Sequence, residues 1–123
     1  MVVCGYDGLD EVTTTTKTMV SEFNGQKIVS YDLDPGDFKI DKVLLDEIKG
    51  GDLKQNVRIA NDILKGTKGP CRDIVILNAA CALYVAQKAK TILEGIKLAG
   101  ESIDSGRALE KMEALKEFTN SGL

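Results

Sequence analysis

The sequence contains no histidine and no tryptophan, and its three cysteines do not show a paired spacing. Without histidine, a His-based catalytic triad is excluded, and without a Cys-x-x-Cys pair a zinc site is not expected. Cys4, Cys71 and Cys81 are an odd number of thiols. We therefore expect them to be reduced, as in a cytoplasmic protein.

Long apolar runs and an excess of positive charge are also lacking. No segment is apolar over enough residues to span a bilayer, and the first residues do not show the pattern of a signal peptide. The net charge is −3 and the pI is near 5.0. An acidic chain without a basic stripe is not expected to bind nucleic acid or an anionic membrane.

The 123 residues, of which 43% are hydrophobic, suffice for the core of one domain or of part of one. The apolar residues 2–5 predict a buried strand. Asn24-Gly25 is a strong hairpin signal, and we expect these two residues to form the loop. That register pairs Phe23 with Gln26, Glu22 with Lys27, and Val20 with Val29.

Threonine is concentrated between Val12 and Val20. Because threonine is β-branched and suits strands, we expect an exposed β surface here. A phosphate-binding role for these hydroxyls is the less favoured alternative. Further along, residues 34–37 have the composition of a turn.

Five helices are predicted from apolar residues at helical spacing. Asp41 is expected to open the first, and Gly50-Gly51 to end it with a left-handed cap. Asp52 is expected to cap the second with Gln55 as its partner. The third is apolar almost all round, and it is too long and too rich in alanine for a strand. The expected helices cover residues 42–49, the segment between Asp52 and Gly66, and residues 72–88, 90–104 and 107–118.

The candidate functional site is the segment Asp7-Gly8-Leu9-Asp10-Glu11, which follows the first strand. Asp10 and Glu11 offer carboxylate oxygens, which suit Mg²⁺. Neighbouring side chains of a regular strand point to opposite faces, so the backbone must turn if both are to share one site. Gly8 permits such a turn. The alternative is a solvated acidic turn.

Asn78 lies inside the apolar third helix. A buried amide needs hydrogen-bond partners, so Asn78 either ties neighbouring backbone together or touches a substrate. The structural role is favoured, because buried polar groups are normally satisfied within the protein.

Several motifs follow one another in a fixed order along nearly the whole chain. They are Val2-Val3-Cys4-Gly5-Tyr6-Asp7-Gly8-Leu9-Asp10-Glu11, Gly50-Gly51-Asp52, Asn56, Arg72-Asp73-Ile74-Val75-Ile76-Leu77-Asn78-Ala79-Ala80, Ala82-Leu83-Tyr84 and Ile103-Asp104-Ser105-Gly106-Arg107-Ala108-Leu109. This ordered set resembles the C-terminal part of the anthranilate phosphoribosyltransferase family.

The resemblance implies an α/β fold, the C-terminal portion of a nucleoside phosphorylase/phosphoribosyltransferase-type domain, with a small sheet and hairpin packed against about five helices. It also implies a transferase that joins anthranilate to the ribose of phosphoribosyl pyrophosphate (PRPP) in tryptophan biosynthesis. Asp10 and Glu11 would then hold Mg²⁺ against the departing pyrophosphate. No residue of this chain is expected to act as a catalytic nucleophile or base.

The chain departs from the family at two positions, because Cys4 stands where histidine is usual and Gln87 where glycine is usual. The family's helical N-terminal domain and its glycine-rich pyrophosphate loop have no counterpart here. We therefore expect residues 1–123 to be a partial domain of a longer enzyme, inactive alone. An uncovered sheet edge or apolar face is then expected to cause self-association.

Two other functions stay open at this point. One is a non-catalytic module of the same fold that acts through protein contacts, which the loss of the histidine at Cys4 mildly favours. The other is a nucleoside phosphorylase, against which the Asp7–Glu11 segment and the helix around Asn78 argue.

Overall fold

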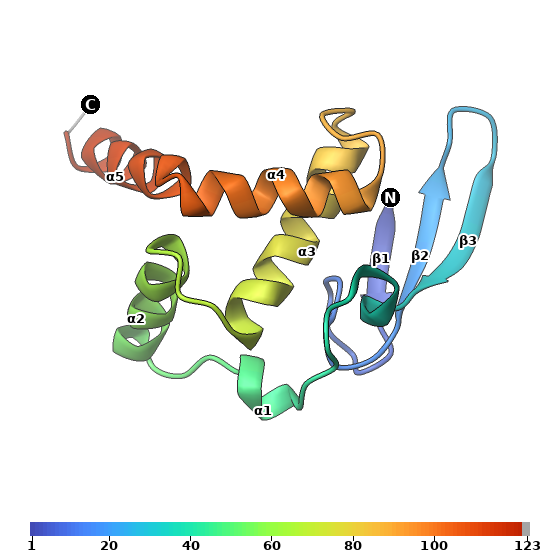
Figure 1. Ribbon diagram of the computed structural model, residues 1–123, viewed down its shortest axis with the longest axis horizontal. Helices are drawn as coiled ribbons and strands as arrows, with labels where there is room; N and C mark the ends of the chain where they lie inside the picture. Colours follow the sequence, from blue (N-terminus) through green and yellow to red (C-terminus); the bar gives the residue numbers. More distant parts are fainter. Residues whose placement is uncertain (122–123) are drawn as a thin grey trace.

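The computed structural model describes residues 1–121 as a three-stranded antiparallel sheet followed by a layer of helices (Figure 1). The strands are β1 (Val2–Gly5), β2 (Thr18–Phe23) and β3 (Ile28–Leu33), in the order β1-β2-β3. A 3-10 turn, η1, covers Pro35–Phe38. The helices are α1 (Leu45–Ile48), α2 (Leu53–Leu64), α3 (Pro70–Val85), α4 (Ile92–Asp104) and α5 (Arg107–Asn120). The expected α/β class with a small sheet and five helices is confirmed.

The hairpin is confirmed, but its predicted register is wrong by two residues. Phe23 pairs with Ile28, Glu22 with Val29 and Val20 with Tyr31. The loop has four residues, because the Asn24 side chain accepts hydrogen bonds from the backbone N–H groups of Gln26 and Lys27. A shift of two residues keeps every side chain on the same face of the sheet, so the alternation of the two faces is unchanged.

The first predicted helix is mostly absent. Only the four residues of α1 are helical, and Leu44, not Asp41, precedes them. The cap expected at Gly50-Gly51 is also absent, since Lys49 ends α1 in an extended conformation and neither glycine has a positive φ. In contrast, Asp52 caps α2 as predicted and accepts a hydrogen bond from the Gln55 N–H at 2.8 Å.

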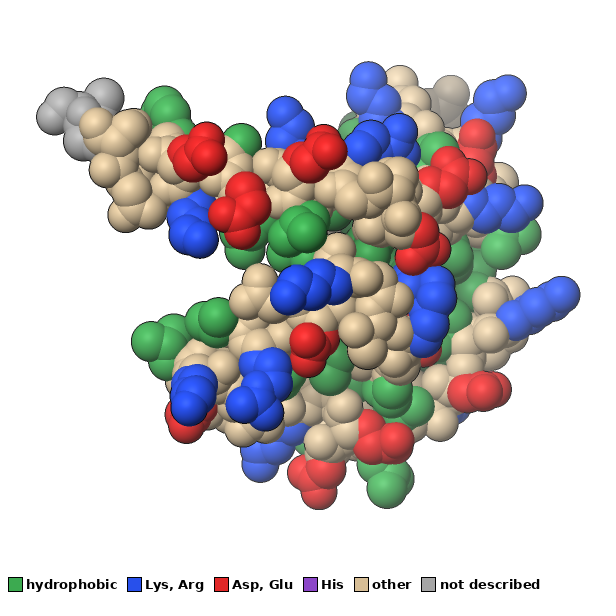
Figure 2. Space-filling model, turned by 60° about the vertical axis from the view of Figure 1, so that its left-hand side comes forward, with side chains coloured by type: hydrophobic (Ala, Val, Ile, Leu, Met, Phe, Trp, Pro, Cys, Tyr) green, Lys and Arg blue, Asp and Glu red, His purple; other side chains and the backbone are tan. Residues whose placement is uncertain are grey.

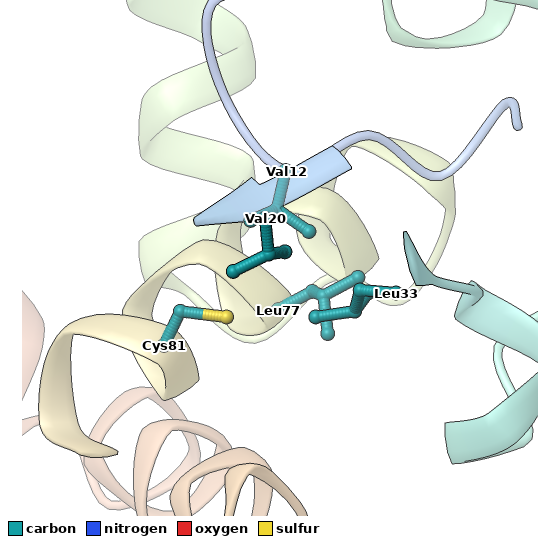
Figure 3. Close-up of a cluster of buried hydrophobic side chains, with 5 residues drawn as sticks. All are labelled: Val12, Val20, Leu33, Leu77 and Cys81. Atoms are coloured by element: carbon teal, nitrogen blue, oxygen red, sulfur yellow. The ribbon is translucent and has the colours of Figure 1, made fainter. Parts of the chain in front are cut away.

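Helix α3 is central, with the sheet against one side and α4 against the other (Figure 1). Its sheet side closes the main core, in which Leu77 and Cys81 meet Val12, Val20 and Leu33 (Figure 3). All five side chains are buried, so this cluster stabilises the fold by removing apolar surface from water. The core therefore fixes the segment around Val12, next to the candidate site, against α3.

Helix α5 extends away from the body of the molecule at the end of α4 (Figure 1). The apolar stripe predicted on it is present but exposed, at Met112, Leu115 and Phe118. Acidic and basic side chains are interspersed on the face that carries the helices (Figure 2). None of the described helices combines the length and apolar character required to cross a bilayer.

Candidate functional site

The site begins where β1 ends in a tight loop. The Gly5 N–H donates to the Leu9 carbonyl at 2.8 Å, and the Gly8 N–H donates to the Gly5 carbonyl at 3.0 Å. Gly8 has a φ of 91°, a conformation that side chains disfavour. The expected turn at Gly8 is therefore confirmed, and it lies between the end of β1 at Gly5 and the two candidate metal ligands.

Asp10 and Glu11 are both exposed at the outer side of this loop. Partial burial raises the pKa of Glu11, and the nearby charges of Asp10 and Asp7 raise it further. Glu11 therefore lies close enough to both other carboxylates to be repelled by them. A divalent cation beside Asp10 and Glu11 would offset that repulsion.

A hollow of about 360 Å³ opens next to Glu11. It is lined by Leu9, Glu11, Leu45, Asp46, Ile48, Lys49, Gly50 and Ile74. Lys49 brings a positive charge to this hollow, and Asp46 a negative one. The site thus combines an exposed acidic pair with a concave surface formed by α1 and the start of α3.

Asp7 has a different role from its two acidic neighbours. Its carboxylate accepts hydrogen bonds from the Leu9 N–H at 3.1 Å, from the Thr13 hydroxyl at 2.6 Å and from the Thr15 hydroxyl. Although burial raises the pKa of Asp7, these hydrogen bonds outweigh it and lower the pKa overall. Asp7 is therefore engaged inside the loop, which the sequence did not reveal.

The threonine run is not the exposed β surface that its β propensity predicted. Residues 13–16 lie in the loop, and Thr13 and Thr14 are buried. The Thr13 N–H donates to the Thr18 hydroxyl at 3.0 Å, and the Thr14 carbonyl accepts from the Val43 N–H at 3.2 Å. Local hydrogen bonding by threonine has overridden its strand preference, because the Asp7 carboxylate supplies an acceptor.

Asn78 has the structural role that was favoured. Its side-chain oxygen accepts from the Val12 N–H at 2.9 Å, and its side-chain nitrogen donates to the carbonyls of Val12 at 2.7 Å and Ile74 at 2.9 Å. The amide therefore ties α3 to the backbone directly after Glu11.

The donor set of the loop fits Mg²⁺ that is shared with a ligand. Within residues 1–121, no group of three or more Asp, Glu, His or Cys side chains is arranged to hold a metal. Two free carboxylates match the usual protein contribution to a Mg²⁺ site, where phosphates and waters complete the coordination.

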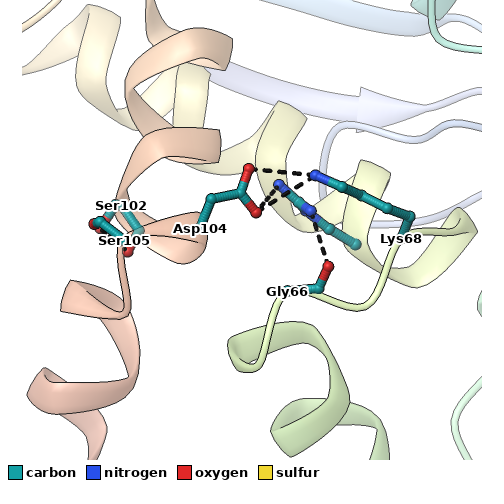
Figure 4. Close-up of polar contacts among 6 residues, drawn as sticks. Gly66, Lys68, Ser102, Asp104 and Ser105 are labelled. Atoms are coloured by element: carbon teal, nitrogen blue, oxygen red, sulfur yellow. Dashed lines mark hydrogen bonds and ion pairs between the residues drawn. The ribbon is translucent and has the colours of Figure 1, made fainter.

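Two further polar clusters were not predicted. The buried Arg72 guanidinium forms an ion pair with the Asp104 carboxylate at 3.0 Å and donates a hydrogen bond to the Gly66 carbonyl at 3.2 Å (Figure 4). Lys68 forms a second ion pair with Asp104, at 3.2 Å. On the sheet side, Glu22 accepts hydrogen bonds from the hydroxyls of Tyr31 at 2.8 Å and Tyr84 at 2.9 Å. Asp104 lies more than 30 residues from Arg72 and Lys68, and Glu22 lies 62 residues from Tyr84, so no local pattern could have identified these three contacts.

The three cysteines are unpaired, as expected, and lie in different surroundings. Cys4 is exposed on β1, Cys71 is half-buried and Cys81 is in the main core. Gln87 follows α3 with a φ of 57°, a left-handed conformation that favours glycine. The departure from the family at this position therefore carries a small backbone cost.

Comparison with known sequences now decides the family. The sequence model described as "Glycosyl transferase family, a/b domain" matches residues 1–109. The chain belongs to this family. It is 49% identical over 118 residues to an anthranilate phosphoribosyltransferase of Thermoanaerobacter sp. (strain X514), covering 96% of this chain and 35% of the relative. The corresponding protein of Clostridium kluyveri (strain ATCC 8527) is 50% identical over 120 residues, 98% of this chain and 36% of its own length.

Solved structures from the same family share the fold. Anthranilate phosphoribosyltransferase from Thermus thermophilus superposes with a TM-score of 0.82 at 34% identity, covering 91% of this chain and 33% of that one. The Saccharomyces cerevisiae enzyme in complex with PRPP and Mg gives a TM-score of 0.81 at 32% identity, over 90% of this chain and 32% of that one. The chain thus spans about a third of the length of the relatives that it matches.

Proposed function

We propose that this glycosyl transferase family chain works as part of an anthranilate phosphoribosyltransferase, in which its Asp10–Glu11 pair holds Mg²⁺ against PRPP. The observation that carries the proposal is the exposed acidic pair in the loop after β1, with a hollow beside Glu11. The similarity to the yeast enzyme in complex with PRPP and Mg supports it. The proposal includes a role in tryptophan biosynthesis and a location in the cytoplasm.

The proposed reaction needs positioning and charge compensation more than acid or base catalysis. A C–N bond forms between the anthranilate amine and the anomeric carbon of the ribose, while the C–O bond to pyrophosphate breaks. When bound, Mg²⁺ would neutralise the charge that develops on the pyrophosphate. Asp10 and Glu11 would hold the ion at the loop, and the hollow beside Glu11 leaves room for a ligand.

The test uses the full-length enzyme that contains this segment. We expect the double variant Asp10→Asn, Glu11→Gln to lower kcat/KM for PRPP by at least about 100-fold, since a bound metal contributes several kcal/mol to charge stabilisation. Its Mg²⁺ requirement should shift to higher concentration. The matched control is Glu117→Gln, an exposed carboxylate on α5, which should behave as wild type. Full activity in the double variant would refute the metal role.

We also propose that residues 1–123 alone are inactive and self-associate. The outward face of the sheet carries exposed apolar side chains, and within residues 1–121 no further strand pairs with the outer edge of β1 or of β3. These side chains are Val2, Met19, Phe23 and Ile28. Sedimentation velocity of the isolated polypeptide should show oligomers that increase with concentration. A single monomer boundary at every concentration, or transferase activity in the isolated polypeptide, would contradict this part.

A further inference from the structure

The residue directly after the acidic pair is fixed in three ways. Both backbone polar groups of Val12 are bonded to the Asn78 side chain, at 2.9 Å and 2.7 Å. The Val12 side chain is 1% exposed and belongs to the main core with Leu77 and Cys81. The backbone that follows Glu11 is therefore held to α3 by hydrogen bonds and by packing.

An amide side chain suits this contact with Val12 because it carries an acceptor and two donors on separate atoms. Asn78 offers an acceptor and two N–H donors, and the second donor is used by the Ile74 carbonyl at 2.9 Å, one turn earlier in α3. That bond helps to hold the amide in the orientation that faces the loop. An ionised carboxylate at position 78 would lack the N–H donors, and an aliphatic side chain would lack both the donors and the acceptor.

The residues directly before the acidic pair are fixed by Asp7. Its carboxylate accepts from the Leu9 N–H and from the hydroxyls of Thr13 and Thr15, so it links both ends of the loop. The space around it is filled, because a Cβ atom at Gly5 would overlap the Asp7 carboxylate and come within 3.1 Å of the Thr13 methyl group. Asp10 and Glu11 thus lie between two anchored points of the backbone.

We propose that Asn78 and Asp7 are positioning residues that hold Asp10 and Glu11 in place for the metal. This inference rests on the metal role proposed above. Ligands fixed before binding lose less conformational freedom when they bind, so affinity rises without any new contact to the ion. Loss of such a supporting contact typically costs about 10–100-fold in metal affinity.

The test measures metal binding by the full-length enzyme. The probe is Mn²⁺ in the presence of inorganic pyrophosphate, with free Mn²⁺ followed by electron paramagnetic resonance. Asn78→Ala removes the contact after the pair. Thr15→Val weakens the contact through Asp7 without changing any charge. We expect each to weaken Mn²⁺ binding, by about 10–100-fold and about 10-fold respectively.

Two matched controls separate positioning from general stability. Asn61 on α2 makes the same kind of intrahelical bond, to the Val57 carbonyl at 2.8 Å, and lies away from the loop. Thr16 is the neighbour of Thr15, and its hydroxyl is not among the partners of Asp7. Asn61→Ala and Thr16→Val should therefore bind Mn²⁺ as wild type does. Thermal unfolding of all four variants reports how much of each effect is stability alone.

The outcomes distinguish this inference from the proposed function. If Asn78→Ala and Thr15→Val fold and bind Mn²⁺ as wild type does, while Asp10→Asn, Glu11→Gln loses binding, the positioning role is overturned and the metal role stands. If the acidic pair itself proves dispensable for Mn²⁺ binding, the metal role fails. If Asn78→Ala does not fold, the Mn²⁺ affinities of Thr15→Val and Thr16→Val are compared instead. Weaker binding by Thr15→Val alone supports the positioning role, and equal binding overturns it.

Discussion

The two sides of α3 are built in different ways. Toward the sheet, the helix presents the apolar side chains of Leu77 and Cys81, the neutral amide of Asn78 and the Tyr84 hydroxyl, which donates to Glu22. Toward α4 it presents a second apolar cluster, in which Ile76 meets Ala99 and Ile103, together with a close backbone contact and an ion pair. A Cβ atom at Gly95 of α4 would lie 2.6 Å from the Ala80 carbonyl oxygen, and Arg72 is paired with Asp104 at 3.0 Å.

The difference shows how one helix serves two purposes. The sheet side has to hold a loop in one conformation, and there the amide satisfies both backbone groups of Val12 without a charge. The α4 side only has to join two helices, and it does so with the apolar cluster of Ile76, Ala99 and Ile103, a close backbone approach and a partly exposed ion pair. Substitutions on the sheet side should therefore affect both stability and the site, and those on the α4 side stability alone.

The largest effect on stability is expected from Leu77→Ala. Leu77 is fully buried in the main core, so the substitution leaves a cavity and should cost about 2–5 kcal/mol. Chemical denaturation of the full-length protein measures it. Leu115→Ala, on the exposed face of α5, should change stability by less than about 0.5 kcal/mol. Equal effects of the two substitutions would show that Leu77 does not belong to the core that stabilises the fold.

On the α4 side, Gly95→Ala should cost about 1–3 kcal/mol, because the new methyl group meets backbone atoms of Ala80 that cannot move aside. Gly100→Ala on the same helix is the matched control. Its Cβ would be 3.9 Å from Arg72, so we expect a gain of about 0.5–1 kcal/mol from helix propensity. The denaturation midpoints of the two variants should therefore move in opposite directions, and a common direction would count against the close helix contact.

A smaller effect, dependent on pH, is expected for Asp104→Asn. Hydrogen bonds from Arg72, and then from Lys68, lower the pKa of the Asp104 carboxyl below its usual 3.8. Because the pKa is lowered in the folded state, the Asp104 ion pair stabilises the protein above about pH 4. This stabilisation is lost as the pH falls through the pKa that Asp104 has in the folded state. The variant should be less stable than wild type near neutral pH, and the difference should shrink in acid. A difference independent of pH would exclude the ion pair as its cause.

The smallest effect is expected at the end of α3, where Gln87 has a φ of 57°. Gln87→Gly should raise stability by about 0.5–1 kcal/mol, since glycine adopts this conformation without a steric cost. Lys88→Gly is the control, and it should not stabilise, because Lys88 has no positive φ. Differential scanning calorimetry can compare the two melting temperatures. A lower melting temperature for Gln87→Gly would mean that the Gln87 side chain makes a compensating contact.

Local signals in the sequence predicted most of the secondary structure. The Asn24-Gly25 turn, the Asp52 cap and the apolar run of α3 all act over a few residues, and all three elements are present. Two of the errors arose where a side-chain hydrogen bond decided the backbone conformation. The hairpin register depended on Asn24 accepting two backbone N–H groups within its own loop, and the conformation of the threonine run depended on the Asp7 carboxylate. Residue propensity alone specifies neither bond.

The sequence by itself determined the fold class, the acidic pair after the first strand and the family to which the chain belongs, because periodicity, turn residues and motif order are properties of the chain. Only the tertiary structure decided what holds that pair. Asn78 meets Val12 across 66 residues, and Arg72 meets Asp104 between two helices. Such contacts form only when packing brings distant segments within hydrogen-bond distance, and a local sequence pattern cannot predict which segments will meet.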